Sequence, residues 1–188
     1  MNKIELEKIH QRIKPYVHNT PVLTSQIINK LCDAEVYFKC ENFQKMGAFK
    51  MRGAVNAILC LNKEQKSKGV VTHSSGNFAQ ALSLASKYLD VDAYIVMPKN
   101  APKVKKAAVR SYGGIIIESD STITARETMA QKIQNEKGAT FIHPSNDNQV
   151  IYGQGTAAIE LLKEHDDLDY IMAPIGGGGL IAGTILAA

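Results

Sequence analysis

The chain has 188 residues, of which 45% are hydrophobic and 21% charged, and its formal net charge is +4. This composition is typical of a globular protein with enough chain to bury a core. Aromatic residues make up only 6%, and no apolar run approaches the roughly 20 residues of a membrane span, which argues against a nucleic-acid surface and a membrane protein. The three cysteines lack CxxC spacing, so we expect reduced thiols in a cytoplasmic protein and no zinc site.

Apolar spacing along the chain alternates between the helical period and short strand-like runs. In chain order it predicts a helix over 4–13, a short helix over 24–31, a strand over 36–40, a helix to about 61, a polar linker over 63–69, a strand over 70–73, a helix over 78–89, a strand over 93–97, a helix over 103–112, a strand over 115–118, a helix over 124–136, a strand over 140–143, a helix over about 155–163 and a strand over 170–175. Strands that alternate with helices predict right-handed βαβ units, and therefore an α/β fold in which parallel sheets are covered by helices.

Functional groups in such folds gather in the loops at the carboxyl ends of the strands. This rule selects three segments of the sequence: the loop after His73, the loop before Lys50 and the glycine run that follows Ile175. We expect these three segments to converge on one crevice.

The glycine run, residues 176–179, separates a predicted strand from the apolar start of a helix. Bare backbone amides at a helix N-terminus suit a phosphate group, and a tight turn alone would need one or two glycines rather than four. Gly177, Gly179 and Ala182 also fit a relaxed dinucleotide-binding fingerprint, but the chain ends before the acidic partner that this fingerprint requires. Phosphate binding is the favoured interpretation.

The other two segments carry polar groups whose roles the local sequence leaves open. The loop from Ser74 to Asn77 offers hydroxyls, an amide and helix amides, which suit a substrate carboxylate as well as an ordinary helix cap. Lys50 lies between Gly47 and Gly53 on a mostly apolar run. A desolvated lysine can act as a nucleophile, but most lysines are solvated, so the local sequence alone does not distinguish the two.

A phosphate site, a carboxylate receptor and a candidate nucleophilic lysine together describe pyridoxal phosphate acting on an amino acid. The chain resembles the serine racemase and serine/threonine dehydratase family of fold-type II pyridoxal-phosphate enzymes over essentially its whole length. The matching motifs, in family order, are Phe38-Lys39-Cys40-Glu41, Gly47-Ala48-Phe49-Lys50-Met51-Arg52-Gly53-Ala54, Ser74-Ser75-Gly76-Asn77, His143-Pro144, Gly153-Gln154-Gly155-Thr156 and Gly176–Gly179.

The resemblance implies a role for each matching position. Lys50 would hold the cofactor covalently, with Phe49 beside it and Asn77 bonded to the ring hydroxyl. The phosphate would bind the amides of Gly176, Gly177, Gly178, Gly179 and Leu180. The substrate carboxylate would bind Ser74, Ser75, Gly76, Asn77 and Phe78. Ser75 would face the substrate from the side opposite Lys50, as a second catalytic residue. Arg126 matches an arginine near the substrate in racemases, although an exposed helix arginine is the slightly favoured alternative.

The resemblance also implies a two-domain fold like that of the tryptophan synthase β chain. Residues 1–68 and 147–188 would form an incomplete large domain, and residues 69–146 a small mobile domain. Family members are considerably longer, so we interpret the chain as truncated and expect a homodimer when complete. A divalent cation such as Mg²⁺ is possible in the complete enzyme, with its ligands outside this chain. The expected substrate is a small hydroxy amino acid.

Two departures and two alternatives qualify this interpretation. The family usually has serine where Ala48 stands and histidine where Phe78 stands, so the identity of the substrate is open, as is the choice between racemase and dehydratase. One alternative is a truncated fragment that folds without catalysis. The other, more remote, is a nicotinamide-binding Rossmann domain, which only the relaxed glycine spacing supports.

Overall fold

The computed structural model describes residues 2–188. A four-stranded parallel sheet runs through one half of it, in the order β5–β4–β3–β6. Its strands are β3 (Val70–His73), β4 (Ala93–Pro98), β5 (Ile115–Ser119) and β6 (Thr140–Phe141). The sequence predicted all four, although β6 stops two residues earlier than expected. The predicted α/β class with a parallel sheet is confirmed.

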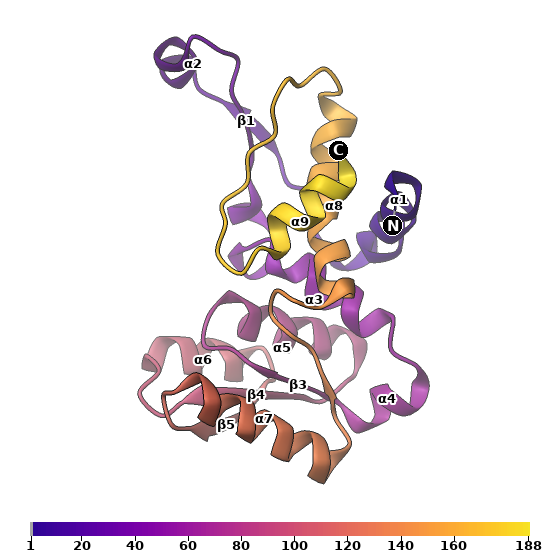
Figure 1. Ribbon diagram of the computed structural model, residues 1–188, viewed down its shortest axis with the longest axis vertical. Helices are drawn as coiled ribbons and strands as arrows, with labels where there is room; N and C mark the ends of the chain where they lie inside the picture. Colours follow the sequence, from indigo (N-terminus) through magenta and orange to yellow (C-terminus); the bar gives the residue numbers. More distant parts are fainter. Residues whose placement is uncertain (1) are drawn as a thin grey trace.

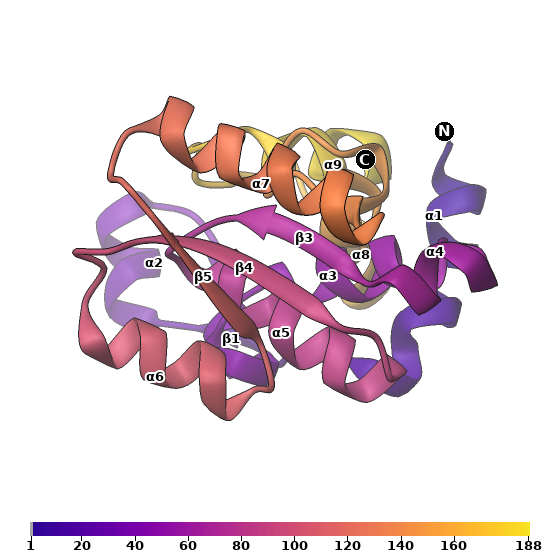
Figure 2. The ribbon, with the colours of Figure 1, turned by 90° about the horizontal axis from the view of Figure 1, so that it is seen from below.

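Helices cover both faces of this sheet (Figure 2). Helices α5 (Asn77–Leu89) and α6 (Lys103–Ser111) lie on one face, and α7 (Ile123–Lys137) lies on the other. Successive side chains of a strand point to opposite faces. Val70 of β3 accordingly joins the hydrophobic core on the α5 side, whereas Val71 packs with Ala130 and Ile133 of α7.

The other long helices form a second group, drawn above the sheet in Figure 1. They are α1 (Lys3–Ile13), α3 (Lys50–Leu59), α8 (Asn148–Glu164) and α9 (Gly179–Ala187). Helix α8 contacts the other three. The absence of a side chain at Gly153 lets the backbone of α8 approach α3 closely. A Cβ atom on Gly153 would lie only 2.6 Å from the Cα of Gly53. A Cβ atom on Gly155 would similarly lie 2.5 Å from the carbonyl oxygen of Gly183 in α9.

Helix α3 connects the two groups, because it packs on α5 as well as on α8 (Figure 1). One hydrophobic core therefore runs from Leu6 of α1 through Met51 and Ile58 of α3 to Leu82 of α5. Lys50 is the first residue of α3, so the fold places it where the two groups of elements meet.

The first part of the chain departs from the predicted parallel arrangement. β1 (Val22–Thr24) and β2 (Tyr37–Lys39) form an antiparallel pair, with Val22 opposite Lys39. Short helix α2 (Gln26–Cys32) joins them and projects from the rest of the molecule (Figure 1). The sequence predicted α2 and β2 but missed β1. The predicted parallel arrangement is therefore wrong for this pair, whose strands run in opposite directions on either side of α2.

Side-chain caps account for two further corrections. Residues 63–69, predicted as a linker, contain helix α4 (Lys63–Lys68), which begins with a capping box between Asn62 and Gln65. Helix α8 begins well before its predicted start at about residue 155, because the Asp147 carboxylate accepts the amide hydrogens of Gln149 and Val150 at 2.8 and 3.1 Å. Each cap supplies acceptors for amides that a helix N-terminus otherwise leaves unpaired.

The strand predicted over 170–175 is absent. Tyr170, Met172 and Ile175 are 83%, 90% and 74% exposed, and the segment has no regular structure. A strand requires a neighbouring strand to pair its backbone groups, and residues 2–188 supply none at this position. The apolar run therefore reaches the glycine run as an exposed, irregular segment.

Candidate active site

A tight turn at Met46 and Gly47 precedes helix α3, which begins with Lys50. Met46 and Gly47 both have positive φ, at 56° and 77°, a left-handed conformation that is rare for a residue with a side chain. These two residues reverse the chain after the short helical turn Glu41–Phe43. Helix α3 then starts with Lys50, without a side-chain cap.

The Lys50 amine is half-buried and has one hydrogen bond within residues 2–188, to the carbonyl oxygen of Pro144 at 2.7 Å. Its Nζ lies 5.2 Å from the ring centre of Phe49 and 5.8 Å from that of Phe78. Burial without a carboxylate partner lowers the pKa of Lys50 below its usual value of 10.5. Desolvation thus increases the share of uncharged amine, the form that can attack a carbonyl or take a proton.

Two residues further along α3, Arg52 has a different environment. It is fully buried and forms two bidentate pairs: Nε and Nη2 donate to Glu41, both at 2.8 Å, and Nη1 and Nη2 donate to Glu160, both at 2.7 Å. Lys39 also contacts Glu160, at 2.9 Å. We call Lys39, Glu41, Arg52 and Glu160 the Arg52 network. It ties α3 to β2 and α8, and thereby fixes the helix that carries Lys50.

Charge and burial act in opposite directions within this network. Burial alone would lower the pKa of Arg52, but its hydrogen bonds with Glu41 and Glu160 outweigh burial and raise it. Burial likewise acts to raise the pKa of Glu160, and the hydrogen bonds from Arg52 and Lys39 overcome it, so that the pKa lies below the usual 4.5. Both shifts favour the ionised forms of Arg52 and Glu160, and the network is structural rather than reactive.

The turn after β6, residues 143–146, touches both Lys50 and the glycine run. Pro144 provides the carbonyl that accepts from Lys50. The side chain of Ser145 occupies the space where a Cβ atom of Gly177 would be, and its carbonyl oxygen lies 2.9 Å from the Cβ position of Gly179. Sequence reasoning missed Pro144 and Ser145 as site residues. Because β6 is parallel to β3, the rule of carboxyl-end loops could have selected them.

The glycine run forms the start of α9. Gly178 is its N-cap, with φ of 81°, and Gly179 is its first residue, without a side-chain cap. The amides of residues 179–181 donate no hydrogen bond within the described chain. Cβ positions on Gly176 and Gly178 would meet no atom within 4 Å. Open space above unpaired helix amides fits the phosphate of the cofactor that the sequence implied.

The loop from Ser74 to Gly76 precedes α5. Gly76 is the N-cap and gives α5 no side-chain cap. Its amide donates to Ser74 Oγ at 3.3 Å, and the Ser74 amide donates to Val96. Ser75 is half-buried and makes no hydrogen bond within residues 2–188. Asn77 is exposed. The first-turn amides and the free hydroxyl could receive a carboxylate.

The structure brings only some of the predicted residues into mutual contact. Lys50, Phe49 and Phe78 are neighbours, and the 143–146 turn links Lys50 to the glycine run. Arg126 lies in the first turn of α7, where Nε donates to Thr122 at 3.4 Å. Its charge contributes to lowering the pKa of His73, the residue that precedes Ser74. No described contact joins Lys50 to Ser75, Asn77 or Arg126.

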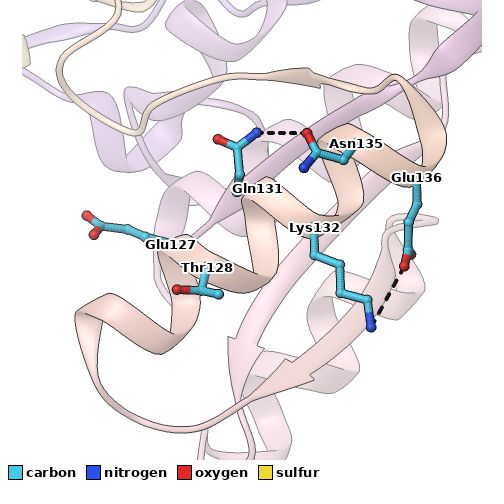
Figure 3. A pocket seen from close by; sticks show the side chains of 6 residues that line it. All are labelled: Glu127, Thr128, Gln131, Lys132, Asn135 and Glu136. Carbon is cyan, nitrogen blue, oxygen red and sulfur yellow. Dashed lines mark hydrogen bonds and ion pairs between the residues drawn. The ribbon is translucent and has the colours of Figure 1, made fainter.

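A hollow of about 670 Å³ lies elsewhere, along the outer face of α7 (Figure 3). Its lining residues are all exposed: Glu127, Thr128, Gln131, Lys132, Asn135 and Glu136. Gln131 bonds Asn135 at 3.1 Å, and Lys132 lies 3.8 Å from Glu136. This is a solvated helix face with locally paired polar groups, and it contains none of the predicted site residues.

Residues 2–188 contain no cluster of three or more His, Cys, Asp or Glu side chains arranged to hold a metal ion. None of the helices in this range combines the length and apolar character needed to cross a membrane. The three cysteines are unpaired.

The chain matches the family of pyridoxal-phosphate dependent enzymes over residues 13–188. It is 54% identical over 185 residues to a serine racemase of Arabidopsis thaliana, covering 98% of this chain and 56% of that protein. It is 51% identical over 177 residues to a β-hydroxyaspartate dehydratase of Paracoccus denitrificans, covering 94% of this chain and 56% of that protein. The crystal structure of serine racemase from Dictyostelium discoideum has a TM-score of 0.96 and 49% identity, covering 100% of this chain and 61% of that one. The chain thus spans little more than half the length of these relatives.

Proposed function

Because the chain belongs to the pyridoxal-phosphate dependent enzymes, we propose that it acts on a small hydroxy amino acid as a serine or threonine dehydratase, a serine racemase, or both. The observation that carries this proposal is the half-buried Lys50 amine, connected through the 143–146 turn to the open amides of the glycine run. Two relatives named as serine racemase and β-hydroxyaspartate dehydratase support the substrate class.

The proposed cofactor contacts are those that the family resemblance implies. Lys50 would hold pyridoxal phosphate covalently, with Phe49 beside it and Asn77 near the ring hydroxyl. The amides from Gly176 to Leu180 would bind its phosphate, supported by the unpaired first turn of α9. When bound, the cofactor supplies an electron-withdrawing ring that stabilises negative charge at the substrate Cα.

The proposed substrate contacts lie at the start of α5. The residues from Ser74 to Phe78 would receive the carboxylate through first-turn amides and hydroxyls, because the N-terminal end of a helix favours an anion. Arg126 is a further candidate, supported by its half-buried position and its electrostatic effect on His73. Phe78 forms an apolar wall near the Lys50 amine, so it also restricts water at the reacting carbon.

Lys50 and Ser75 would divide the proton transfers between two faces of the substrate. Once the substrate amine has replaced it on the cofactor, the Lys50 amine would be free to remove the Cα proton, a role that its lowered pKa supports. Loss of the β-hydroxyl as water, followed by hydrolysis, then releases a 2-oxo acid and ammonia. Alternatively, a proton from Ser75 reaches Cα from the opposite face and gives the D-amino acid.

We also propose the domain division 1–68 with 147–188 and 69–146. It is supported by the separate group of α1, α3, α8 and α9 beside the parallel sheet (Figure 1). Closure of the two parts over the substrate would expel water. A homodimer, a divalent-cation requirement of the complete enzyme and a cytoplasmic location belong to the same proposal, the last supported by the unpaired cysteines.

The test is to mix the purified protein with pyridoxal phosphate, reduce with borohydride and locate the adduct by mass spectrometry. Adduct at Lys50 is the expected result, and no adduct or one spread over surface lysines contradicts the proposal. Incubation with L-serine, L-threonine and L-threo-3-hydroxyaspartate, with 2-oxo acid and D-amino acid measured together, then identifies the reaction. In Ser75→Ala, loss of D-serine with retained 2-oxo acid supports the two-face assignment, whereas equal loss of both means that Ser75 only positions the substrate.

A second candidate is a chain that folds but does not hold the cofactor. It is favoured by the chain spanning 56% of the length of its racemase relative. A purified protein that melts cooperatively and gives no reducible adduct would support this candidate. No feature beyond the glycine spacing favours a nicotinamide-binding domain, whereas the family match favours pyridoxal phosphate.

A further inference from the structure

The turn formed by residues 143–146, which we call the His143 turn, contacts both parts of the proposed cofactor site. Its Pro144 carbonyl oxygen accepts from Lys50 Nζ at 2.7 Å. Its Ser145 side chain lies against Gly177, and the Ser145 carbonyl lies against Gly179. The shape of this one turn therefore determines where the lysine amine and the glycine run lie relative to each other.

A single imidazole nitrogen holds the turn together. Nδ1 of His143 accepts the amide hydrogens of Ser145 at 3.1 Å and of Asn146 at 2.8 Å. A ring nitrogen accepts only when it carries no proton. These two bonds therefore require a neutral ring with its hydrogen on Nε2, and protonation of Nδ1 would remove both.

Aromatic and charged neighbours surround the ring. His73 of β3 lies edge-on at 5.7 Å between ring centres, and Phe141 of β6 lies at 6.2 Å. His143 contributes to lowering the pKa of His73, after the larger effect of burial. From α7, Arg126 also lowers the pKa of His73 and Glu127 raises it. On the other side of the turn, the cation that faces it is Lys50 of α3.

We propose that His143 is a positioning residue whose neutral imidazole sets the His143 turn and thereby orients the free Lys50 amine toward the glycine run for attachment of the cofactor. The inference rests on the proposed function and deepens it. It gives a physical role to the His143-Pro144 motif, which matched the family without one. When Nδ1 cannot accept, the hydrogen bonds from the Ser145 and Asn146 amides are both lost. The Pro144 carbonyl then no longer holds the Lys50 amine.

Three variants separate this role from simple packing. In His143→Asn the side-chain oxygen is bonded to Cγ, as Nδ1 is, so the acceptor keeps its place. In His143→Gln the acceptor lies one bond further out, and in His143→Phe it is absent while the ring is kept. His165→Gln is the matched control, because His165 is also half-buried against an aromatic ring, that of Tyr37, but contacts none of the site.

The first readout is the rate at which acetic anhydride labels Lys50 in the cofactor-free protein, relative to an exposed lysine such as Lys63. We expect wild type, His143→Asn and His165→Gln to agree within about twofold, and His143→Gln and His143→Phe to differ from them by about tenfold, the scale of one hydrogen bond. The rate of the reducible adduct with pyridoxal phosphate should fall in the same order. Wild-type behaviour of His143→Gln, or an equal change in His143→Asn and His143→Phe, would overturn the proposal.

Amide hydrogen exchange provides a further measurement. Amide exchange should accelerate at Ser145 and Asn146 in His143→Phe while it stays slow at Gln149 and Val150, which Asp147 caps independently; unchanged exchange at residues 145 and 146 would contradict the proposal. If no variant forms an adduct, the proposed function fails, and the labelling and exchange results still decide the role of His143.

Discussion

Lys50 and Arg52 are cationic side chains two residues apart in the first turn of α3, yet their surroundings differ in every respect. Arg52 is fully buried and meets two carboxylates through four hydrogen bonds of 2.7–2.8 Å. Lys50 is half-buried and meets one neutral carbonyl. Burial is compensated at Arg52, whose pKa rises, and uncompensated at Lys50, whose pKa falls. The helix thus carries Arg52, whose charge is paired with two carboxylates and stabilises the fold. Close to it lies Lys50, which has no carboxylate partner and is available for chemistry.

The largest expected effect is complete loss of the cofactor adduct in Lys50→Ala, because no other amine contacts the Pro144 carbonyl in residues 2–188. Borohydride reduction and peptide mass spectrometry measure it. Lys45→Ala is the matched control, since Lys45 lies nearby with its Nζ 4.8 Å from the ring centre of Tyr88. A full yield of adduct in Lys50→Ala would show that the contrast between the two cations has no functional meaning.

Arg52→Met should lower the free energy of unfolding by about 3–5 kcal/mol, because it leaves Glu160 buried without its main partner. Urea unfolding measures the change. Arg12→Met is the control: Arg12 is exposed and donates to Asn56, and loss of one such bond should cost about 1 kcal/mol. Equal costs at the two arginines would mean that the Arg52 network does not stabilise the fold.

Gly153 of α8 and Gly176 of the glycine run provide a third comparison, between a close contact with α3 and open space. An alanine Cβ at Gly153 would lie 2.5 Å from the carbonyl oxygen of Arg52, so Gly153→Ala should destabilise by about 1–3 kcal/mol through backbone displacement. Gly176→Ala adds a methyl group to open space, and should leave stability nearly unchanged while weakening phosphate binding. Thermal unfolding with and without inorganic phosphate measures both effects. A large loss of stability in Gly176→Ala would contradict the open cradle.

The smallest expected effect is the loss of the contribution of Glu160 to folding stability at acidic pH. The folded-state pKa of Glu160 is lowered below 4.5, burial being outweighed by its bonds to Arg52 and Lys39. Its contribution to stability is therefore complete above pH 4.5 and is lost as the pH falls through the lowered value. The stability difference between wild type and Glu160→Gln should shrink across that range. Urea midpoints measured from neutral to acidic pH test this, and a difference that stays constant would show that Glu160 is not the titrating partner.

The sequence predicted the elements whose stability is local or periodic. The helix over Asn77–Leu89 and the strands around Val71 and Val96 follow from apolar spacing alone. The missed start of α8 depends on one Asp147 side chain, and the absent strand at 170–175 depends on a neighbour that residues 2–188 do not contain. Periodicity carries no information about either.

The candidate site divides in the same way. The glycine run was recognisable from its own chemistry, because it is a continuous stretch before an apolar helix. The role of Lys50 was predicted only through the family resemblance of the motif around it. The Pro144 carbonyl and the Arg52–Glu160 pair were not recognisable, because each joins residues 94 and 108 positions apart in the sequence. Such contacts leave no spacing signal within the chain. Only the packing of α3 between α5 and α8 creates them.

The separation of Arg52 and Glu160 has a consequence for synthesis of the chain on the ribosome. At about 5–20 residues per second, Arg52 is made roughly 5–20 s before Glu160. Strands β3, β4 and β5 and helices α5 and α6 are all made within that interval, and their contacts span shorter stretches of chain. The fourth strand, β6, also precedes Glu160, so all strands of the sheet are synthesised while the arginine still lacks its second carboxylate. The contacts that fix α3, with Lys50 at its start, can therefore form only when α8 has been synthesised.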